Sequence, residues 1–100
     1  MGQQLAYFNR GRGGHILYSD KQQVIKFEIE IGGGDCVVII YIPTTQEWEK
    51  ETNTNLSQRQ EILDFVCKQV IIDQARGCDC VITDNCIEVI RKPKRKWFNW

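Results

Sequence analysis

The sequence lacks the features that would place the chain in or across a membrane. None of its apolar runs approaches the roughly 20 residues that a membrane-spanning helix needs. The stretch from Met1 to Arg10 has neither the basic nor the apolar region of a secretory signal. We therefore expect a cytoplasmic protein with no integral membrane association.

Residues that commonly perform catalysis are scarce. His15 is the only histidine, so any mechanism that pairs a cysteine or a serine with a histidine would have to use it. It stands beside a glycine-rich turn, where a partly exposed histidine without a special role is the usual case. Glu47 and Glu51 are four residues apart, but acidic side chains are common near the start of a helix because of the helix dipole. We predict no catalytic residue and no cofactor.

The cysteines do not follow a zinc-binding pattern, because the paired Cys-x-x-Cys motifs of common zinc modules are missing. A turn at Asp84-Asn85 would also place Cys86 on the sheet face opposite Cys80. We predict no metal site and reduced cysteines that pack as small hydrophobic side chains. A reactive thiol at Cys78, Cys80 or Cys86 is the remaining route to an enzyme. The five cysteines are Cys36, Cys67, Cys78, Cys80 and Cys86.

The composition is that of a folded domain, since 42% of the 100 residues are hydrophobic and 26% are charged. A chain of this size buries roughly two thirds of the surface that its unfolded form exposes, so it can fold without disulfides. We expect residues 1–90 to form a single α+β domain and residues 91–100 to form a basic, aromatic C-terminal tail.

Hydrophobic patterns predict the strands of a mainly antiparallel sheet. The clearest is Val24 to Ile31, where apolar and charged residues alternate with the period of a strand. Cys36 to Ile42 is an almost unbroken apolar run, which is typical of a central strand covered on both faces. A hairpin around Asp84-Asn85 would pair Ile82 with Ile87. Other strands are predicted at Leu5–Phe8, His15–Tyr18, Cys80–Thr83 and Cys86–Ile90, with a glycine-rich loop at Asn9–Gly14.

A short helix is predicted near Thr45 to Glu51. Thr44 and Glu47 have the spacing of a capping box, in which two side chains satisfy the free amides at a helix start. We expect Trp48 to anchor this helix to the core.

A long helix is predicted from about Ser57 to Arg76. Ser57 and Gln60 repeat the capping-box spacing, and Gly77 stands where a helix end favours glycine. We expect this helix to pack on one face of the sheet, with Phe65 and Val70 among the most buried side chains.

Opposite charges divide the chain, although its formal net charge is zero. The tail holds five of the 13 basic residues, which leaves 8 basic against 13 acidic residues in 1–90, a net charge of −5. The tail also carries three aromatic residues. Its candidate binding residues are Arg91, Lys92, Lys94, Arg95, Lys96, Trp97, Phe98 and Trp100.

Arg10 and Arg12 in the glycine-rich loop complete the set of candidate binding residues. The leading hypothesis is a non-catalytic interaction or regulatory module that binds another protein or itself, as a homodimer. The alternative is a module for single-stranded nucleic acid, in which the cations hold phosphates and the tail aromatics stack on bases. The acidic body opposes that alternative, and an enzyme with a reactive cysteine is the third hypothesis.

Overall fold

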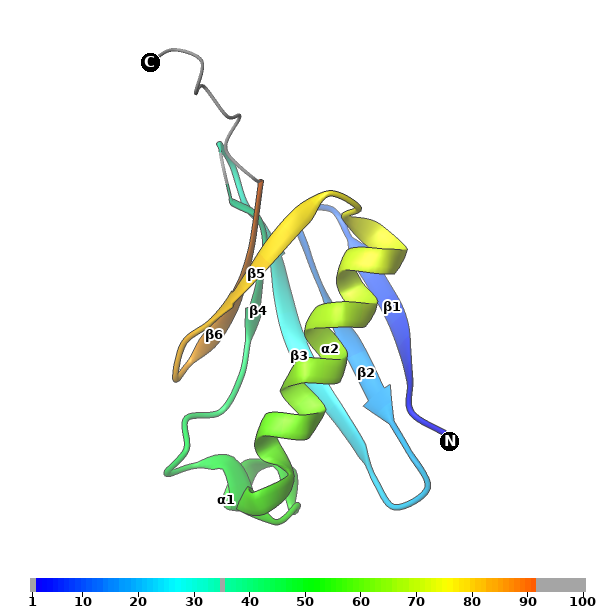
Figure 1. The fold of residues 1–100 in the computed structure, drawn as a ribbon, viewed down its shortest axis with the longest axis vertical. Helices are drawn as coiled ribbons and strands as arrows, with labels where there is room; N and C mark the ends of the chain where they lie inside the picture. The colour runs from blue at the N-terminus through cyan, green and yellow to red at the C-terminus, as the bar shows by residue number, and fades with distance from the viewer. Residues whose placement is uncertain (1, 35, 92–100) are drawn as a thin grey trace, which may run out of the picture.

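The structure, a computed structural model, describes residues 2–34 and 36–91. These residues form an α+β fold with one six-stranded antiparallel sheet and one long helix, as the sequence predicts in outline (Figure 1). Within the same residues, no helix has the length and apolar character needed to cross a membrane. The elements are β1 (Gln4–Arg10), β2 (Gly13–Ser19), β3 (Val24–Ile31), β4 (Cys36–Tyr41), α1 (Trp48–Thr52), the 3-10 helix η1 (Leu56–Gln58), α2 (Arg59–Gln74), β5 (Cys78–Ile82) and β6 (Cys86–Arg91).

The strand order across the sheet is β1-β2-β3-β4-β6-β5. The first four strands are neighbours in the order of the chain. After β4 the chain passes through the helices, returns as β5 at the far edge, and then turns so that β6 fills the place between β4 and β5. The last described strand is therefore an interior strand of the sheet.

Two strand predictions are confirmed closely. β3 has the predicted bounds Val24–Ile31, and Ile25, Phe27 and Ile29 are buried while the residues between them are exposed. The β5–β6 hairpin turns at Asp84-Asn85 and pairs Ile82 with Ile87, as its turn residues predict.

Two strand predictions are wrong in detail. β4 lies in the interior of the sheet, but Tyr41 is 45% exposed and Val37 to Ile39 are only half-buried, so its two faces are not both covered by described residues. The predicted loop at Asn9–Gly14 is a turn of two residues, because β1 continues to Arg10 and β2 starts at Gly13. A Cβ atom at Gly14 would overlap the carbonyl oxygen of Phe8, so this glycine allows close approach of two strands.

The short helix α1 begins at Trp48 rather than near Thr45. The Thr44 hydroxyl does accept a hydrogen bond from the Glu47 amide at 3.3 Å, but this bond closes the turn that precedes the helix. Trp48 is fully buried, and its indole N–H donates to the carbonyl oxygen of Asn55 at 3.3 Å. The prediction that Trp48 anchors α1 to the core is confirmed.

Ser57 does not cap the long helix as predicted. The side-chain oxygen of Asn55 instead accepts a hydrogen bond from the Ser57 amide at 2.8 Å and starts η1, which leads into α2. Asn55 precedes the capping-box pattern, so the pattern placed the cap two residues too late. At the other end, Gly77 adopts a φ of +86°, the left-handed conformation that the sequence predicts there.

The core joins α2 to the strands. The side chains of Leu63, Val66 and Val70 are at most 2% exposed and share one hydrophobic cluster with Phe27 of β3. These three residues form a helical stripe with spacings of three and four. Phe65 flanks that stripe and is only half-buried, with its ring against the edge of the Tyr18 ring at 5.9 Å. The prediction for Val70 is therefore confirmed and that for Phe65 is wrong.

Arg59, the first residue of α2, is buried at 8% exposure. Its Nη2 donates hydrogen bonds to the carbonyl oxygens of Pro43 and Asp84, at 3.0 and 2.9 Å. The guanidinium also lies 5.8 Å from the centre of the Trp48 ring. One side chain thus joins the start of α2, the connection after β4 and the β5–β6 turn.

Replacing Leu63 by alanine should lower the free energy of unfolding by about 2–5 kcal/mol, because it leaves a cavity in the core. The matched control is Ile72→Ala on the same helix, where the side chain is 53% exposed and the loss should stay below about 1 kcal/mol. Urea denaturation of both variants measures the difference. Equal losses would show that α2 does not bury Leu63.

Arg59→Ala should lower the free energy of unfolding by about 3 kcal/mol, because the carbonyl oxygens of Pro43 and Asp84 lose a charged donor that is itself buried. Arg76→Ala is the control, since the exposed Arg76 donates to the Ile72 carbonyl, one turn back. Its effect should be about 0.5 kcal/mol or less. If thermal and urea unfolding show the same loss of stability for both variants, the role of Arg59 is contradicted.

Candidate functional site

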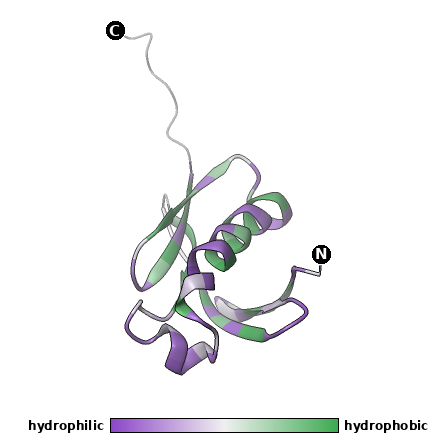
Figure 2. Ribbon diagram, turned by 60° about the horizontal axis from the view of Figure 1, so that its bottom comes forward, coloured by the Kyte–Doolittle hydropathy of each residue, from purple (hydrophilic) through white to green (hydrophobic). Residues whose placement is uncertain are grey.

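Along each strand, side chains that point into the core alternate with side chains that point to the opposite face of the sheet. We call this opposite face the outer face. Successive side chains of a strand point to opposite faces, so this face carries the residues between the core positions. It exposes Phe8 of β1, Tyr41 of β4 and Val81 of β5, which are 48%, 45% and 41% exposed. Figure 2 shows hydrophobic residues along the strands and on α2, whereas α1 is mostly hydrophilic.

One row of the outer face crosses the sheet from β1 to β5. Pairing aligns Arg10, Gly13, Glu30, Ile39, Glu88 and Val81, one from each described strand. Neighbouring strands lie about 4.8 Å apart, so Glu30 and Glu88 are about 10 Å apart with Ile39 between them. We call Glu30, Ile39 and Glu88 the acidic row.

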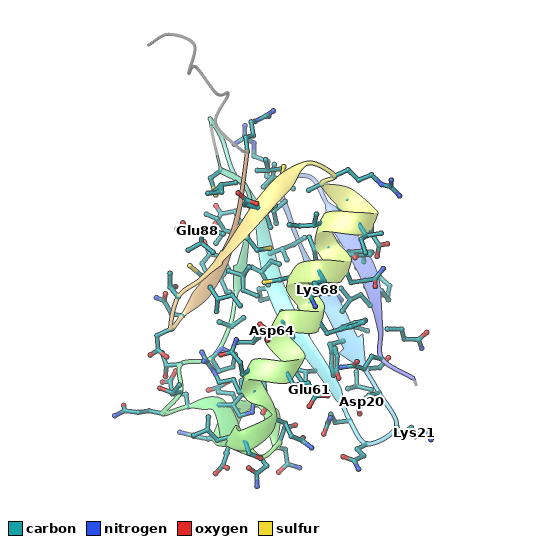
Figure 3. The ribbon with its side chains drawn as sticks, viewed as in Figure 1. Asp20, Lys21, Glu61, Asp64, Lys68 and Glu88 are labelled. Atoms are coloured by element: carbon teal, nitrogen blue, oxygen red, sulfur yellow. The ribbon has the colours of Figure 1, made fainter. Side chains whose placement is uncertain are left out.

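Tyr41 extends the acidic row along β4. Its hydroxyl donates to Glu30 Oε1 at 2.6 Å, which fixes the carboxylate beside an exposed ring. This hydrogen bond to an acceptor carboxylate is the main reason that the pKa of Tyr41 is raised. Figure 3 labels Glu88 beside β6, to the left of the labelled charged residues of α2. The outer face therefore presents carboxylates among apolar side chains.

A hollow of about 570 Å³ lies at the β1–β2 end of the outer face. Its aromatic wall is the stacked pair of Phe8 and His15, whose ring centres are 5.0 Å apart. Gly13 in its lining has no side chain to fill the space. Glu28, which pairs with Lys26 at 3.3 Å, and Arg10 supply charges at its margin. The hollow can take an aromatic side chain, and we call it the hairpin hollow.

The structure places three of the predicted binding residues. Arg10 is exposed at the end of β1 and lines the hairpin hollow. Arg12 is exposed in the following turn, where its carbonyl oxygen accepts from the Ile31 amide at 2.7 Å. Arg91 is exposed at the end of β6, and its Nε donates to the carbonyl oxygen of Gly34 at 3.4 Å. The other predicted residues, Lys92, Lys94, Arg95, Lys96, Trp97, Phe98 and Trp100, lie outside the described residues.

The cysteines divide between the two faces, as the turn at Asp84-Asn85 predicts. Cys80 pairs with Val89 on the core side, whereas Cys86 pairs with Tyr41 on the outer face. In the part of the chain that the structure describes, no group of three or more His, Cys, Asp or Glu side chains converges as a metal site would require.

A second hollow, of about 550 Å³, lies along the first half of α2. Figure 3 labels Glu61, Asp64 and Lys68 along this helix, with Asp20 nearby at the β2–β3 turn. The Tyr18 hydroxyl donates to Asp20 Oδ2 at 2.7 Å. Burial raises the pKa of Tyr18 to about 12, and the Tyr18 hydrogen bond lowers the pKa of Asp20. These bonds close the β2–β3 turn, so we assign them a structural role.

Sequence reasoning missed the acidic row. The alternation along β3 marks Glu30 as a surface residue, and the alternation along β6 does the same for Glu88. Their proximity depends on β6 pairing with β4, which the order of the chain does not reveal. Local patterns could therefore identify each residue but not the pair.

The chain matches no protein-family model, and searches of curated proteins and of solved structures returned no match.

The stability of the protein should fall between pH 10 and pH 12 because of Tyr18. Its pKa is about 12 in the folded state and about 10 when unfolded, so the folded state holds the proton more tightly. That contribution is fully present below pH 10 and is lost as the pH rises to 12. Urea unfolding at pH 9 to 12 should show a shallower decline for Tyr18→Phe than for the wild type. Parallel declines would contradict the titration of Tyr18.

Proposed function

We propose that this protein is a non-catalytic interaction module whose outer sheet face binds a basic, aromatic polypeptide segment. The C-terminal tail of a second copy of the chain is the segment that fits. The observation that carries the proposal is the acidic row, Glu30–Ile39–Glu88, flanked by the exposed side chains of Tyr41 and Val81. Carboxylates among apolar groups complement cations among aromatic groups.

The proposal also holds that α2 closes the opposite face of the sheet. Leu63 and Val66 of α2 lie in one cluster with Ile16 and Phe27 of the strands, which supports this arrangement. Because α2 then covers the opposite face, the outer face is the one on which a partner can bury Tyr41 and Val81.

The spacing of the tail cations fits the spacing of the carboxylates. A segment in the polyproline II conformation, which Pro93 favours, has three residues per turn and rises about 3.1 Å per residue, so side chains three residues apart lie on the same side and about 9 Å apart. Lys92 and Arg95 are three residues apart in the sequence, and Glu30 and Glu88 are separated by nearly the same distance across the sheet. A tail in this conformation lying across the strands would therefore bring one cation to each carboxylate.

The order of cationic and aromatic residues along the tail matches the order of carboxylates and the hairpin hollow along the outer face. With Lys92 at Glu88 and Arg95 at Glu30, the next two strand positions in the same direction belong to β2 and β1. Trp97 and Phe98 follow Arg95 by two and three residues, a reach of about 6–9 Å in the same conformation. That reach leads to the hairpin hollow, where the Phe8–His15 stack offers an aromatic wall.

The tail of a second copy fits this path better than the tail of the same chain. Arg91 follows Glu88 by three residues on the same strand, so the tail of the same chain would have to reverse direction before it could cross the acidic row. That reversal would use the basic residues that the row requires. A second copy can present the same residues in an extended form.

The Glu30→Gln, Glu88→Gln double variant should weaken binding of a synthetic peptide with the sequence of residues 91–100 by about tenfold. Two ion pairs at a partly exposed surface are together worth about 1.4 kcal/mol, and glutamine keeps the shape of the side chain. Fluorescence anisotropy measures peptide binding, and sedimentation velocity measures self-association of the full chain.

The matched control is Glu61→Gln, Asp64→Asn, which removes the same charge from α2 and should leave peptide affinity unchanged. Changing Trp97, Phe98 and Trp100 together to alanine should abolish self-association even at low salt. If both acidic variants weaken binding equally, charge alone drives the interaction and the outer face is not the site. Tight binding of single-stranded RNA at 150 mM salt, without peptide binding, would favour the nucleic-acid alternative.

A further inference from the structure

Two cysteines meet where α2 contacts β5. Cys67 lies on α2 and Cys80 on β5, and the Cys80 thiol donates a hydrogen bond to the carbonyl oxygen of Cys67, with 3.7 Å between sulfur and oxygen. Cys67 is 9% exposed and Cys80 is half-buried. The pair therefore combines one covered thiol with one that solvent can reach.

The two sulfurs differ in their tendency to ionise. The pKa of Cys80 is lowered because the Cys67 thiol can donate a hydrogen bond to the Cys80 thiolate, although burial opposes this effect. The same bond, together with burial, raises the pKa of Cys67. In the neutral pair the Cys80 thiol donates to the Cys67 carbonyl, and once Cys80 ionises the Cys67 thiol can stabilise the thiolate.

A small reagent can reach this pair through an apolar hollow of about 400 Å³. Its lining is Cys67, Lys68, Ile71, Ile72 and Cys80. Ile72 at this hollow is 53% exposed. An accessible thiolate with a second thiol beside it is the arrangement found at redox-sensitive cysteines.

We propose that Cys67 and Cys80 are a reversible disulfide site that hydrogen peroxide oxidises. The Cys80 thiolate attacks the peroxide, so that a sulfur–oxygen bond forms, the oxygen–oxygen bond breaks and hydroxide leaves. The Cys67 sulfur then attacks the Cys80 sulfur, a sulfur–sulfur bond forms, and the departing hydroxide takes the Cys67 proton to become water. A dithiol reductant then reduces the disulfide and restores both thiols. This proposal does not depend on the proposed binding function.

The disulfide would fasten α2 to β5 across the connection that contains Gly77. Closing this loop restricts the unfolded chain, so oxidation should raise the melting temperature by on the order of 10 °C. The sequence-based expectation of reduced, structural cysteines would then not apply to this pair under oxidant.

Peptide mapping can test the site on the wild-type protein. An endoproteinase that cleaves before aspartate would release each cysteine in its own peptide, because an aspartate precedes Cys36, Cys67, Cys80 and Cys86 and separates Cys78 from Cys80. After treatment of the folded protein with hydrogen peroxide, mass spectrometry should find the peptides of Cys67 and Cys80 linked, with the loss of two hydrogens. Links distributed over all five cysteines, or no link, would overturn the proposal.

Variants then assign the two roles. Cys67→Ser should stop at a sulfenic acid on Cys80, which dimedone traps, whereas Cys80→Ser should lose rapid oxidation. Cys78→Ser and Cys86→Ser are matched controls that should still form the Cys67–Cys80 link. Circular dichroism checks that each variant is folded. Loss of the link in the controls, or equal dimedone labelling in all variants, would contradict the assignment.

Discussion

The two hydrogen bonds that Arg59 donates fix the part of the fold on which the rest of the sheet depends. Pro43 lies where the chain leaves β4, and Asp84 lies where β5 turns into β6. Because one guanidinium bonds to both carbonyl oxygens, the β5–β6 hairpin is held against the end of β4. The amide of Ile42 also donates to the Asn85 carbonyl oxygen at 3.0 Å, which supports the same alignment. The acidic row exists only because this alignment places β6 beside β4.

The sequence predicted those parts of the fold that local chemistry determines. The alternation along β3, the Asp84-Asn85 turn and the left-handed Gly77 each depend on residues close together in the chain. Trp48 was predicted to anchor the short helix to the core rather than to bind a sugar or a base. Each of these features could be identified without knowing which strands are neighbours.

The features that sequence analysis missed depend on distant partners. Arg59 looks like an ordinary polar residue at a helix start, since its acceptors are backbone carbonyls 16 and 25 residues away. Leu63 replaces Phe65 at the centre of the buried stripe because the rotation of α2 about its axis depends on which of its residues join the common hydrophobic cluster. The acidic row and the Cys67–Cys80 pair likewise require the tertiary fold.

The interior position of β6 has a mechanical consequence for anything attached at Arg91. β6 is hydrogen-bonded to β4 on one side and to β5 on the other. Hydrogen bonds of an antiparallel ladder lie perpendicular to the strands, so a pull along β6 loads many of them at once in shear. An edge strand would have only one such ladder to resist the same pull. Tension applied at Arg91 is thus shared by two ladders and passed to the centre of the sheet.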